Sequence, residues 1–217
     1  MATLTSTPTP RIPRVHRHPA LLTSEEFLNW LKPGIHADLI GGFVFKRTPV
    51  SMPHAHLLNF LDRLLGVYIE EENLGQLFRE TVAVRLSTRE TFLPDLAYFT
   101  NSKITRLPET HAPFAPAFVT EVLSPATAKR DTELKFAAYE LHGVQEYWIL
   151  DPQKLQHRFY KRNVDVLEEF SEHEERVDSV SIPGFWIKRA WLNPAKLPSV
   201  SACLAKIVRS KKTRRSS

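Results

Sequence analysis

The chain has 217 residues, of which 42% are hydrophobic, 10% aromatic and 24% charged. This composition is typical of a globular protein, and it excludes a disordered chain, a collagen-like repeat and a small fold that needs disulfides. The single cysteine, Cys203, excludes an internal disulfide and a cysteine-ligated zinc cluster, and it favours the reducing cytoplasm. No stretch approaches the roughly 18 apolar residues of a membrane span. With only 7 glycines, the sequence also lacks a glycine-rich phosphate-binding loop.

The net charge of +5 comes from the two ends of the chain. Nine of the 29 basic residues lie in the first 20 residues or from residue 206 onward, where there is no acidic residue. The body between them therefore has 20 basic and 24 acidic residues, and its charge alone does not indicate nucleic-acid binding. We expect a disordered basic leader over residues 1–22, a single domain over 23–195 and a disordered basic tail over 196–217.

In the first third of the chain, the sequence predicts a short helix, a hairpin and a long helix. The short helix follows a capping residue, Thr23 or Ser24, and ends at about Leu31, before a Pro-Gly pair. Residues 38–47 predict two short strands around a Gly-Gly turn. Apolar residues then recur every three or four positions over 54–73, which predicts the longest helix.

The rest of the chain predicts strands, interrupted by one helix at about 128–141. The stretches are short, β-branched or aromatic, and Pro, Asn or Asp separates them. The expected strands are 76–86, 93–99, 117–123, 146–150 and 155–161, followed by a possible pair at 164–170 and 176–181. This order predicts an α/β fold, a mixed β-sheet flanked by helices with extra C-terminal strands.

Two acidic residues interrupt the apolar strands. Alternation along 117–123 places Glu121 on one face with Val119 and Leu123. An ionised carboxylate buried there without a partner would cost several kcal/mol, so it needs a cation, a metal ion or N–H donors. Asp95 follows Pro94 at the start of another apolar strand. A structural ion pair for Glu121 and a turn or capping role for Asp95 are the alternatives.

A lysine on the following helix completes a chemically meaningful set. Asp131 and Lys135 are four residues apart and so share one helix face, although an exposed ion pair would have the same spacing. Two carboxylates on adjacent strands form an oxygen-only site for a hard cation, most naturally Mg²⁺. A nearby lysine can neutralise developing negative charge or help to deprotonate a water. Metal-dependent hydrolysis of a phosphodiester needs these groups.

The sequence Pro94-Asp95, followed by Glu121-Val-Leu on the next strand, resembles the PD-(D/E)XK nuclease superfamily. The segment 121–152 is similar to the Uma-two family of restriction-endonuclease-like proteins, and weaker similarity extends over about 24–192. The resemblance implies a restriction-endonuclease-like fold and a metal-dependent endonuclease that hydrolyses nucleic acid, with DNA as the expected substrate.

The resemblance also implies roles for individual residues. Asp95, Glu121 and the backbone carbonyl of Val122 would bind Mg²⁺ or Mn²⁺, and Lys135 would act near the attacking water. His54, at the start of the long helix, would contact a substrate phosphate, although a capping or exposed histidine is the alternative. Asp131 would orient Lys135 or lie just outside the metal ligands, near the substrate.

The sequence departs from the family pattern at three positions. Leu123 occupies the place of the superfamily lysine, whose role would pass to Lys135, and Gly41 and Phe43 stand where relatives often have acidic residues. A catalytically silent nuclease-fold protein that binds nucleic acid or protein is therefore the alternative function, and an α/β protein with purely structural acids is a third interpretation. Because cutting a duplex on both strands needs two sites, we expect a homodimer, located in the cytoplasm and without membrane contact.

Overall fold

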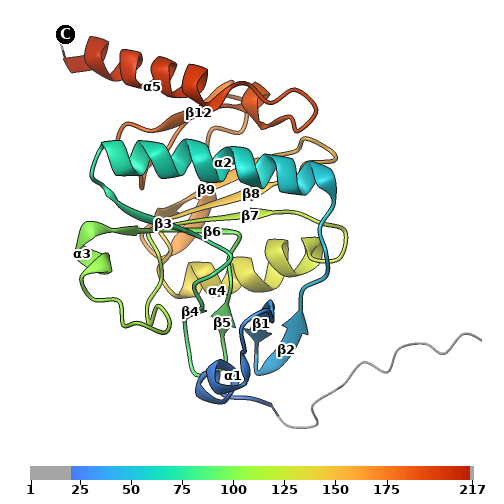
Figure 1. Ribbon diagram of the computed structural model, residues 1–217. Coiled ribbons are helices and arrows are strands. Elements are labelled where there is room, and N and C mark those ends of the chain that lie inside the picture. Colours follow the sequence, from blue (N-terminus) through green and yellow to red (C-terminus); the bar gives the residue numbers. More distant parts are fainter. Residues whose placement is uncertain (1–20, 216–217) are drawn as a thin grey trace, which may run out of the picture.

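The structure is a computed structural model and describes residues 21–215, so the first 20 residues of the expected leader lie outside it. Figure 1 shows its helices and strands in chain order. The helical segments are α1 (Ser24–Trp30), α2 (Met52–Glu71), α3 (Asn101–Ile104), the π-helical turn η1 (Arg130–Leu134), α4 (Lys135–Leu141), the 3-10 turn η2 (Arg189–Leu192) and α5 (Val200–Arg215).

The strands form three sheets. The small sheet has the order β2-β1-β5-β4, with β1 (Ala37–Ile40), β2 (Phe43–Lys46), β4 (Val84–Arg85) and β5 (Thr91–Phe92). The large sheet has the order β10-β9-β8-β7-β6-β3, with β3 (Gly75–Arg79), β6 (Leu96–Thr100), β7 (Phe118–Val122), β8 (Glu146–Leu150), β9 (Arg158–Asn163) and β10 (Val166–Glu169). β11 (Arg176–Asp178) and β12 (Trp186–Lys188) form a hairpin.

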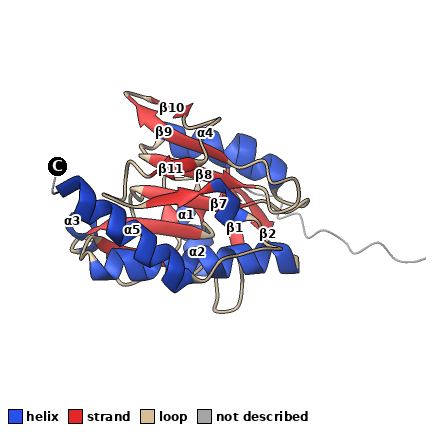
Figure 2. Ribbon diagram, turned by 90° about the horizontal axis from the view of Figure 1, so that it is seen from above, coloured by secondary structure: helices blue, strands red, loops and turns tan. Residues whose placement is uncertain are grey.

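The large sheet is mixed and is covered by helices on both faces, as the sequence predicts (Figure 1). Within the large sheet, β7 and β8 pair in parallel and the other neighbouring strands pair antiparallel, and the crossover between β7 and β8 carries η1 and α4. Viewed from above, α2 and α5 lie together on one side of the sheet, away from α4 (Figure 2). The small sheet and α1 lie below, on the side of α4 (Figure 1). This arrangement brings the small sheet and α4 to the same face of the large sheet.

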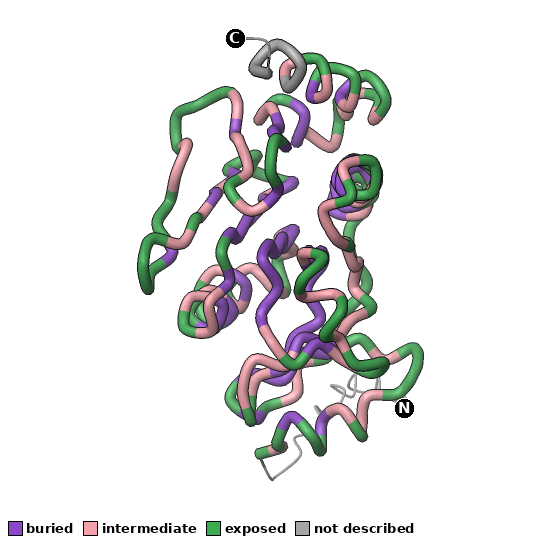
Figure 3. The backbone as a smooth tube through the Cα atoms, turned by 90° about the vertical axis from the view of Figure 1, so that its left-hand side faces the viewer, coloured by how far each residue is buried: buried purple, intermediate pink, exposed green. Residues whose placement is uncertain are grey.

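Alternation along β7 separates two hydrophobic cores. Phe118 and Val122 pack with α2 and with the C-terminal elements, whereas Val119 packs with α4 residues such as Tyr139. β7 and its neighbour β8 are buried along their whole length, and Figure 3 shows continuous buried stretches in the interior of the molecule. Glu121 occupies the α4 face of β7 because it is two residues from Val119.

Local sequence signals explain the first elements. Thr23 and Glu26 form a capping box at α1. The hairpin turn between β1 and β2 uses Gly41 and Gly42 with φ of +57° and +85°, a conformation that favours glycine. The long helix α2 begins two residues earlier than expected, because the hydroxyl of Ser51 caps it by accepting a hydrogen bond from the N–H of His54.

The expected strand over 76–86 is two strands in different sheets, β3 and β4, since the chain leaves the large sheet after Arg79. The helix expected over 128–141 begins with the π-helical turn η1. Short elements such as β5, α3 and β12 had no periodic pattern to predict them. Within the described residues, none of the helices combines the length and apolar character that crossing a membrane requires.

The expectation of a disordered tail over 196–217 is wrong for most of that segment, because residues 200–215 form α5. Cys203 and Ile207 are buried against α2 and the other C-terminal elements. The hydroxyl of Ser210 also accepts a hydrogen bond from the indole N–H of Trp186. The basic residues of this segment hide an apolar face, because Val200, Cys203, Leu204 and Ile207 recur at a spacing of three or four residues and pack against the core.

Candidate functional site

A pocket of about 380 Å³ opens where α2 begins, β6 begins and β7 ends. Its walls come from the loop after β2, from the start of α2, from the two strands and from the start of α4. The residues that line it are His36, Arg47, Thr48, Pro49, Val50, His54, Glu80, Asp95, Glu121, Val122, Ser124, Thr127, Asp131 and Lys135. All six residues that the sequence analysis selected are among them.

Asp95 and Glu121 lie on neighbouring strands at this pocket. β6 and β7 are antiparallel with Leu96 opposite Thr120, so the residue before Leu96 comes level with the residue after Thr120. One carboxylate oxygen of Asp95 accepts a hydrogen bond of 2.8 Å from the backbone N–H of Val122. The side chains of Asp95 and Glu121 are 4% and 2% exposed, respectively. Both residues therefore line one pocket.

Lys135 reaches back over the sheet from the first residue of α4. Its ammonium donates a hydrogen bond of 2.9 Å to Glu121 Oε1, and it lies 3.3 Å from Asp131 Oδ1. The phenol of Tyr139, one turn further along α4, donates a second hydrogen bond to the same Glu121 oxygen. The lysine side chain is only 2% exposed, so the pair with Asp131 is buried rather than a surface ion pair.

The structure adds two residues to the site that the sequence analysis did not select. Asp38, on β1, accepts a hydrogen bond from the N–H of Leu93 and lies 3.3 Å from the Lys135 ammonium. Arg47 follows β2, and its guanidinium donates a hydrogen bond of 2.8 Å to Asp95 Oδ1. The same guanidinium lies 3.9 Å from Glu121 Oε2. Both residues come from the small sheet, across the pocket from β7.

One signal for Asp38 was present in the sequence. It occupies an apolar strand, Ala-Asp-Leu-Ile, in the way that Glu121 does, and the argument about buried carboxylates applies equally to it. Arg47 gave no such signal, because an arginine at the end of a strand is usually exposed. The position of Arg47 depends on the docking of the small sheet, which no local pattern reports.

The buried charges around the pocket do not balance. Within the described residues, four buried carboxylates face two cationic side chains, which leaves two negative charges; the acids are Asp38, Asp95, Glu121 and Asp131, and the bases are Arg47 and Lys135. Burial, together with the nearby Asp95 and Asp131, outweighs Lys135 and raises the pKa of Glu121 to about 8. Burial likewise raises the pKa of Asp131. The surplus of negative charge is therefore strong enough to favour protonation of a carboxylate.

Lys135 and Arg47 remain protonated, because the surrounding carboxylates raise the pKa of both groups. Burial acts to lower the pKa of Lys135, but Asp38, Glu121 and Asp131 outweigh it and raise that pKa above its usual value. Asp38 is held ionised, because Lys135 and Arg47 outweigh the burial of its carboxyl and lower its pKa. Lys135 is thus an ammonium ion, suited to stabilising negative charge rather than to accepting a proton.

His54 is buried at the first turn of α2, with 3% of its surface exposed. Neither ring nitrogen has a hydrogen-bond partner, and Nε2 lies 3.8 Å from Asp95 Oδ2. The interpretation of an exposed histidine is therefore wrong. Although the backbone N–H of His54 is capped by Ser51, its imidazole lines the pocket with unused hydrogen-bonding capacity.

The departures from the family pattern lie at different distances from this pocket. Gly41 and Phe43 form the exposed β1–β2 turn and do not line it. Leu123 is partly buried against the α4-side core. Asp38, by contrast, is part of the cluster, because it lies 3.3 Å from the Lys135 ammonium.

The donor set fits a hard divalent cation in chemistry and in charge. Asp95 and Glu121 offer carboxylate oxygens to one pocket, and a charge of +2 would balance the two surplus negative charges that the cluster carries when Glu121 is ionised. In the part of the chain that the structure describes, no three His, Cys, Asp or Glu side chains form a ready metal-binding cluster. Cationic side chains, instead of a third acidic ligand, contact the carboxylates here.

The fold and site define a restriction-endonuclease-like class of protein. The Uma2 family, described as "Putative restriction endonuclease", matches residues 24–193, and the chain belongs to this family. A crystal structure of "a putative nuclease belonging to DUF820" from Anabaena variabilis is similar in fold, with a TM-score of 0.62 and 18% identity. The similarity covers 86% of this chain and 99% of that protein. No curated protein matches the chain.

Proposed function

We propose that the protein is a metal-dependent endonuclease that hydrolyses phosphodiester bonds in nucleic acid, with DNA as the expected substrate and Mg²⁺ or Mn²⁺ as the cation. The observation that carries this proposal is the charge imbalance around the pocket, where four buried carboxylates face two cationic side chains; three of the acids line the pocket, and Asp38 contacts Lys135 beside it. A purely structural cluster would gain nothing from having two more acids than bases, whereas a divalent cation would balance these acids once Glu121 is ionised.

In this proposal, Asp95, Glu121 and the backbone carbonyl of Val122 hold the cation. When bound, the cation supplies a Lewis acid that activates water and stabilises charge on the phosphate. Lys135 holds Glu121 in place through its 2.9 Å hydrogen bond and adds positive charge beside the reacting phosphate. Asp131 positions the lysine from the same helical segment.

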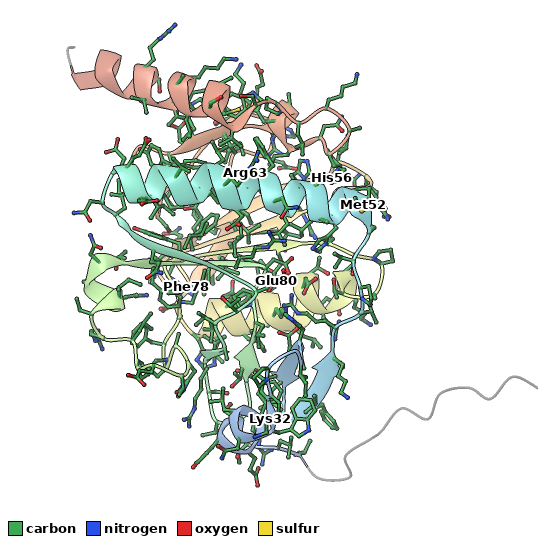
Figure 4. The ribbon with its side chains drawn as sticks, in the orientation of Figure 1. Lys32, Met52, His56, Arg63, Phe78 and Glu80 are labelled. Carbon is green, nitrogen blue, oxygen red and sulfur yellow. The ribbon has the colours of Figure 1, made fainter. Side chains whose placement is uncertain are left out.

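The side of the pocket that is formed by the loop after β2 and by the start of α2 would receive the substrate. The imidazole of His54 has two unsatisfied nitrogens that face the pocket, and a phosphate oxygen would satisfy one of them. The exposed side chain of Val50 also lines the pocket, and Figure 4 shows Met52, another exposed residue, at the start of α2.

The proposal is tested by incubating a supercoiled plasmid with the purified protein and Mg²⁺ or Mn²⁺. We expect the wild type to nick or linearise the plasmid, and Asp95→Asn and Glu121→Gln to abolish cleavage. Glu133→Gln is the matched control, because Glu133 lies on η1 beside Asp131 but is 60% exposed. Loss of cleavage in the two pocket variants, with cleavage by the control equal to that of the wild type, would exclude a contaminating nuclease.

Thermal melts in chelator separate metal binding from structural pairing. Removing Glu121 leaves Lys135 its contacts with Asp38 and Asp131, so Glu121→Gln relieves repulsion without stranding a cation. We expect this variant to melt at or above the wild type without metal, and to lose the stabilisation that Mg²⁺ gives. A markedly lower melting temperature without metal would favour the structural role. A stable wild type that binds nucleic acid but cleaves none would favour the catalytically silent alternative.

A further inference from the structure

Arg47 occupies an unusual place between the carboxylates. Its Nη1 donates to Asp95 Oδ1, and its Nη2 lies near Glu121 Oε2 and donates to the carbonyl of Leu93. Its Nε lies 3.5 Å from Asp38 Oδ2 but has no hydrogen-bond partner. One guanidinium therefore contacts three of the four buried acids and spans the two residues proposed to hold the cation.

Arg47 differs from Lys135 in its exposure. The lysine side chain is 2% exposed and is enclosed by three carboxylates, whereas the arginine side chain is 13% exposed and lines the pocket. On its outer side, Nη1 lies 3.8 Å from Glu80, which is 27% exposed. Figure 4 shows Glu80 between the levels of α2 and α4. The arginine therefore borders the open side of the pocket, whereas the lysine is enclosed.

We infer that Arg47 is a built-in counter-ion that competes with the divalent cation for Asp95 and Glu121. In the metal-free protein the guanidinium keeps the two carboxylates close together despite their repulsion. When a cation binds, Arg47 gives up its contact with Asp95 and turns toward the mouth of the pocket, where an incoming phosphate replaces the carboxylate as its partner. This inference rests on the proposed function.

Competition and a purely supporting role predict opposite changes in metal affinity when Arg47 is replaced. If the guanidinium competes with the cation, removing its charge strengthens metal binding, because the same two carboxylates then face one positive charge fewer. If Arg47 only organises the ligands, removing it separates them and weakens metal binding. The direction of the change in affinity therefore decides between the two roles.

The test is isothermal titration of Mn²⁺ into the wild type, Arg47→Gln and Arg47→Lys, together with their melting temperatures in chelator. We expect Arg47→Gln to melt lower than the wild type without metal, yet to bind Mn²⁺ about tenfold more tightly. Arg47→Lys retains the charge and should bind within about threefold of the wild type. An unchanged or weaker affinity in Arg47→Gln would overturn the inference while leaving the proposed function intact.

Arg79→Met is the matched control, because Arg79 also pairs with Glu80 but does not line the pocket. We expect its Mn²⁺ affinity to equal that of the wild type. If Arg47→Gln does not fold, a crystal structure of the wild type with Mn²⁺ decides: an intact 2.8 Å contact between Arg47 and Asp95 beside the bound ion overturns the inference. If neither the wild type nor any of the variants binds Mn²⁺, the metal site of the proposed function is overturned instead.

Discussion

At the residue scale, the charge of the site depends on Lys135 more than on any acid. Its ammonium lies within 3.3 Å of three carboxylates, from β1, β7 and η1. Removing an acid reduces the surplus of negative charge in the cluster, whereas removing Lys135 enlarges that surplus. Lys135 is therefore the residue at which folding and chemistry are hardest to separate.

We predict that Lys135→Met destabilises the metal-free protein by about 3–5 kcal/mol, because it leaves buried carboxylates without their main counter-charge. Denaturant unfolding at pH 7 measures the change. Lys129→Met removes a lysine that also pairs with an acid four residues away, but at 84% exposure, so it should change stability by less than about 0.5 kcal/mol. Equal effects of the two substitutions would contradict the buried charge cluster.

Much of the site could be predicted from single residues. Asp95 and Glu121 were found because a carboxylate in an apolar strand demands a partner, and Asp131 and Lys135 because they share a helix face. Arg47 could not be found in this way, since its burial results from contacts with segments up to 74 residues away in the sequence. Residues whose role arises only from tertiary docking leave no local trace.

At the element scale, the junction between β5 and β6 explains the position of Asp95. The chain leaves the small sheet at Phe92 and enters the large sheet at Leu96, so Pro94 and Asp95 lie where the two sheets meet. Sequence patterns predicted the long helix and most strands of the large sheet, because these elements have clear periodicity. They did not assign strands to two sheets, since β4 and β5 have only two residues each.

Two glycines should respond to alanine with opposite signs. Gly75 begins β3 with φ of +149°, and an added Cβ would lie 2.0 Å from the carbonyl oxygen of Phe99 on β6. Gly75→Ala should therefore cost about 2–3 kcal/mol. Gly66 lies within α2 with no atom within 4 Å of such a Cβ, so Gly66→Ala should stabilise by about 0.5–1 kcal/mol. Melting temperatures that fall for both would show that α2 packs differently at Gly66.

At the scale of the whole molecule, the chain offers one pocket among its described residues that carries this chemistry. Cutting both strands of a duplex needs two such sites, and exposed apolar residues are available for association. Val164 and Val166 at the β9–β10 hairpin are 83% and 47% exposed, and Leu141 at the end of α4 is 77% exposed. The homodimer and the cytoplasmic location stay predictions, as does the single domain over 23–195.

We predict a symmetric dimer that uses the β9–β10 hairpin. Light scattering at micromolar concentration should give twice the chain mass of 24.9 kDa. Val166→Lys should shift the protein toward the monomer without lowering its melting temperature in dilute solution, because the side chain is already half exposed. A monomeric wild type would remove the dimer but not the proposed chemistry.

The order of the charged residues along the chain has a consequence for synthesis. A ribosome makes Asp38, Arg47 and Asp95 before Glu121, and it makes Lys135 last among the groups that contact Glu121 through charge. Asp38 and Asp95 are thus synthesised after or close to Arg47, which is their counter-charge. Glu121 is synthesised 14 residues before Lys135, with which it forms its hydrogen-bonded ion pair. The small sheet and β6, which follows Asp95, are synthesised before η1 and α4. The N-terminal half of the nascent chain can therefore fold around Arg47 first, and the site is completed only when the crossover to β8 has been synthesised.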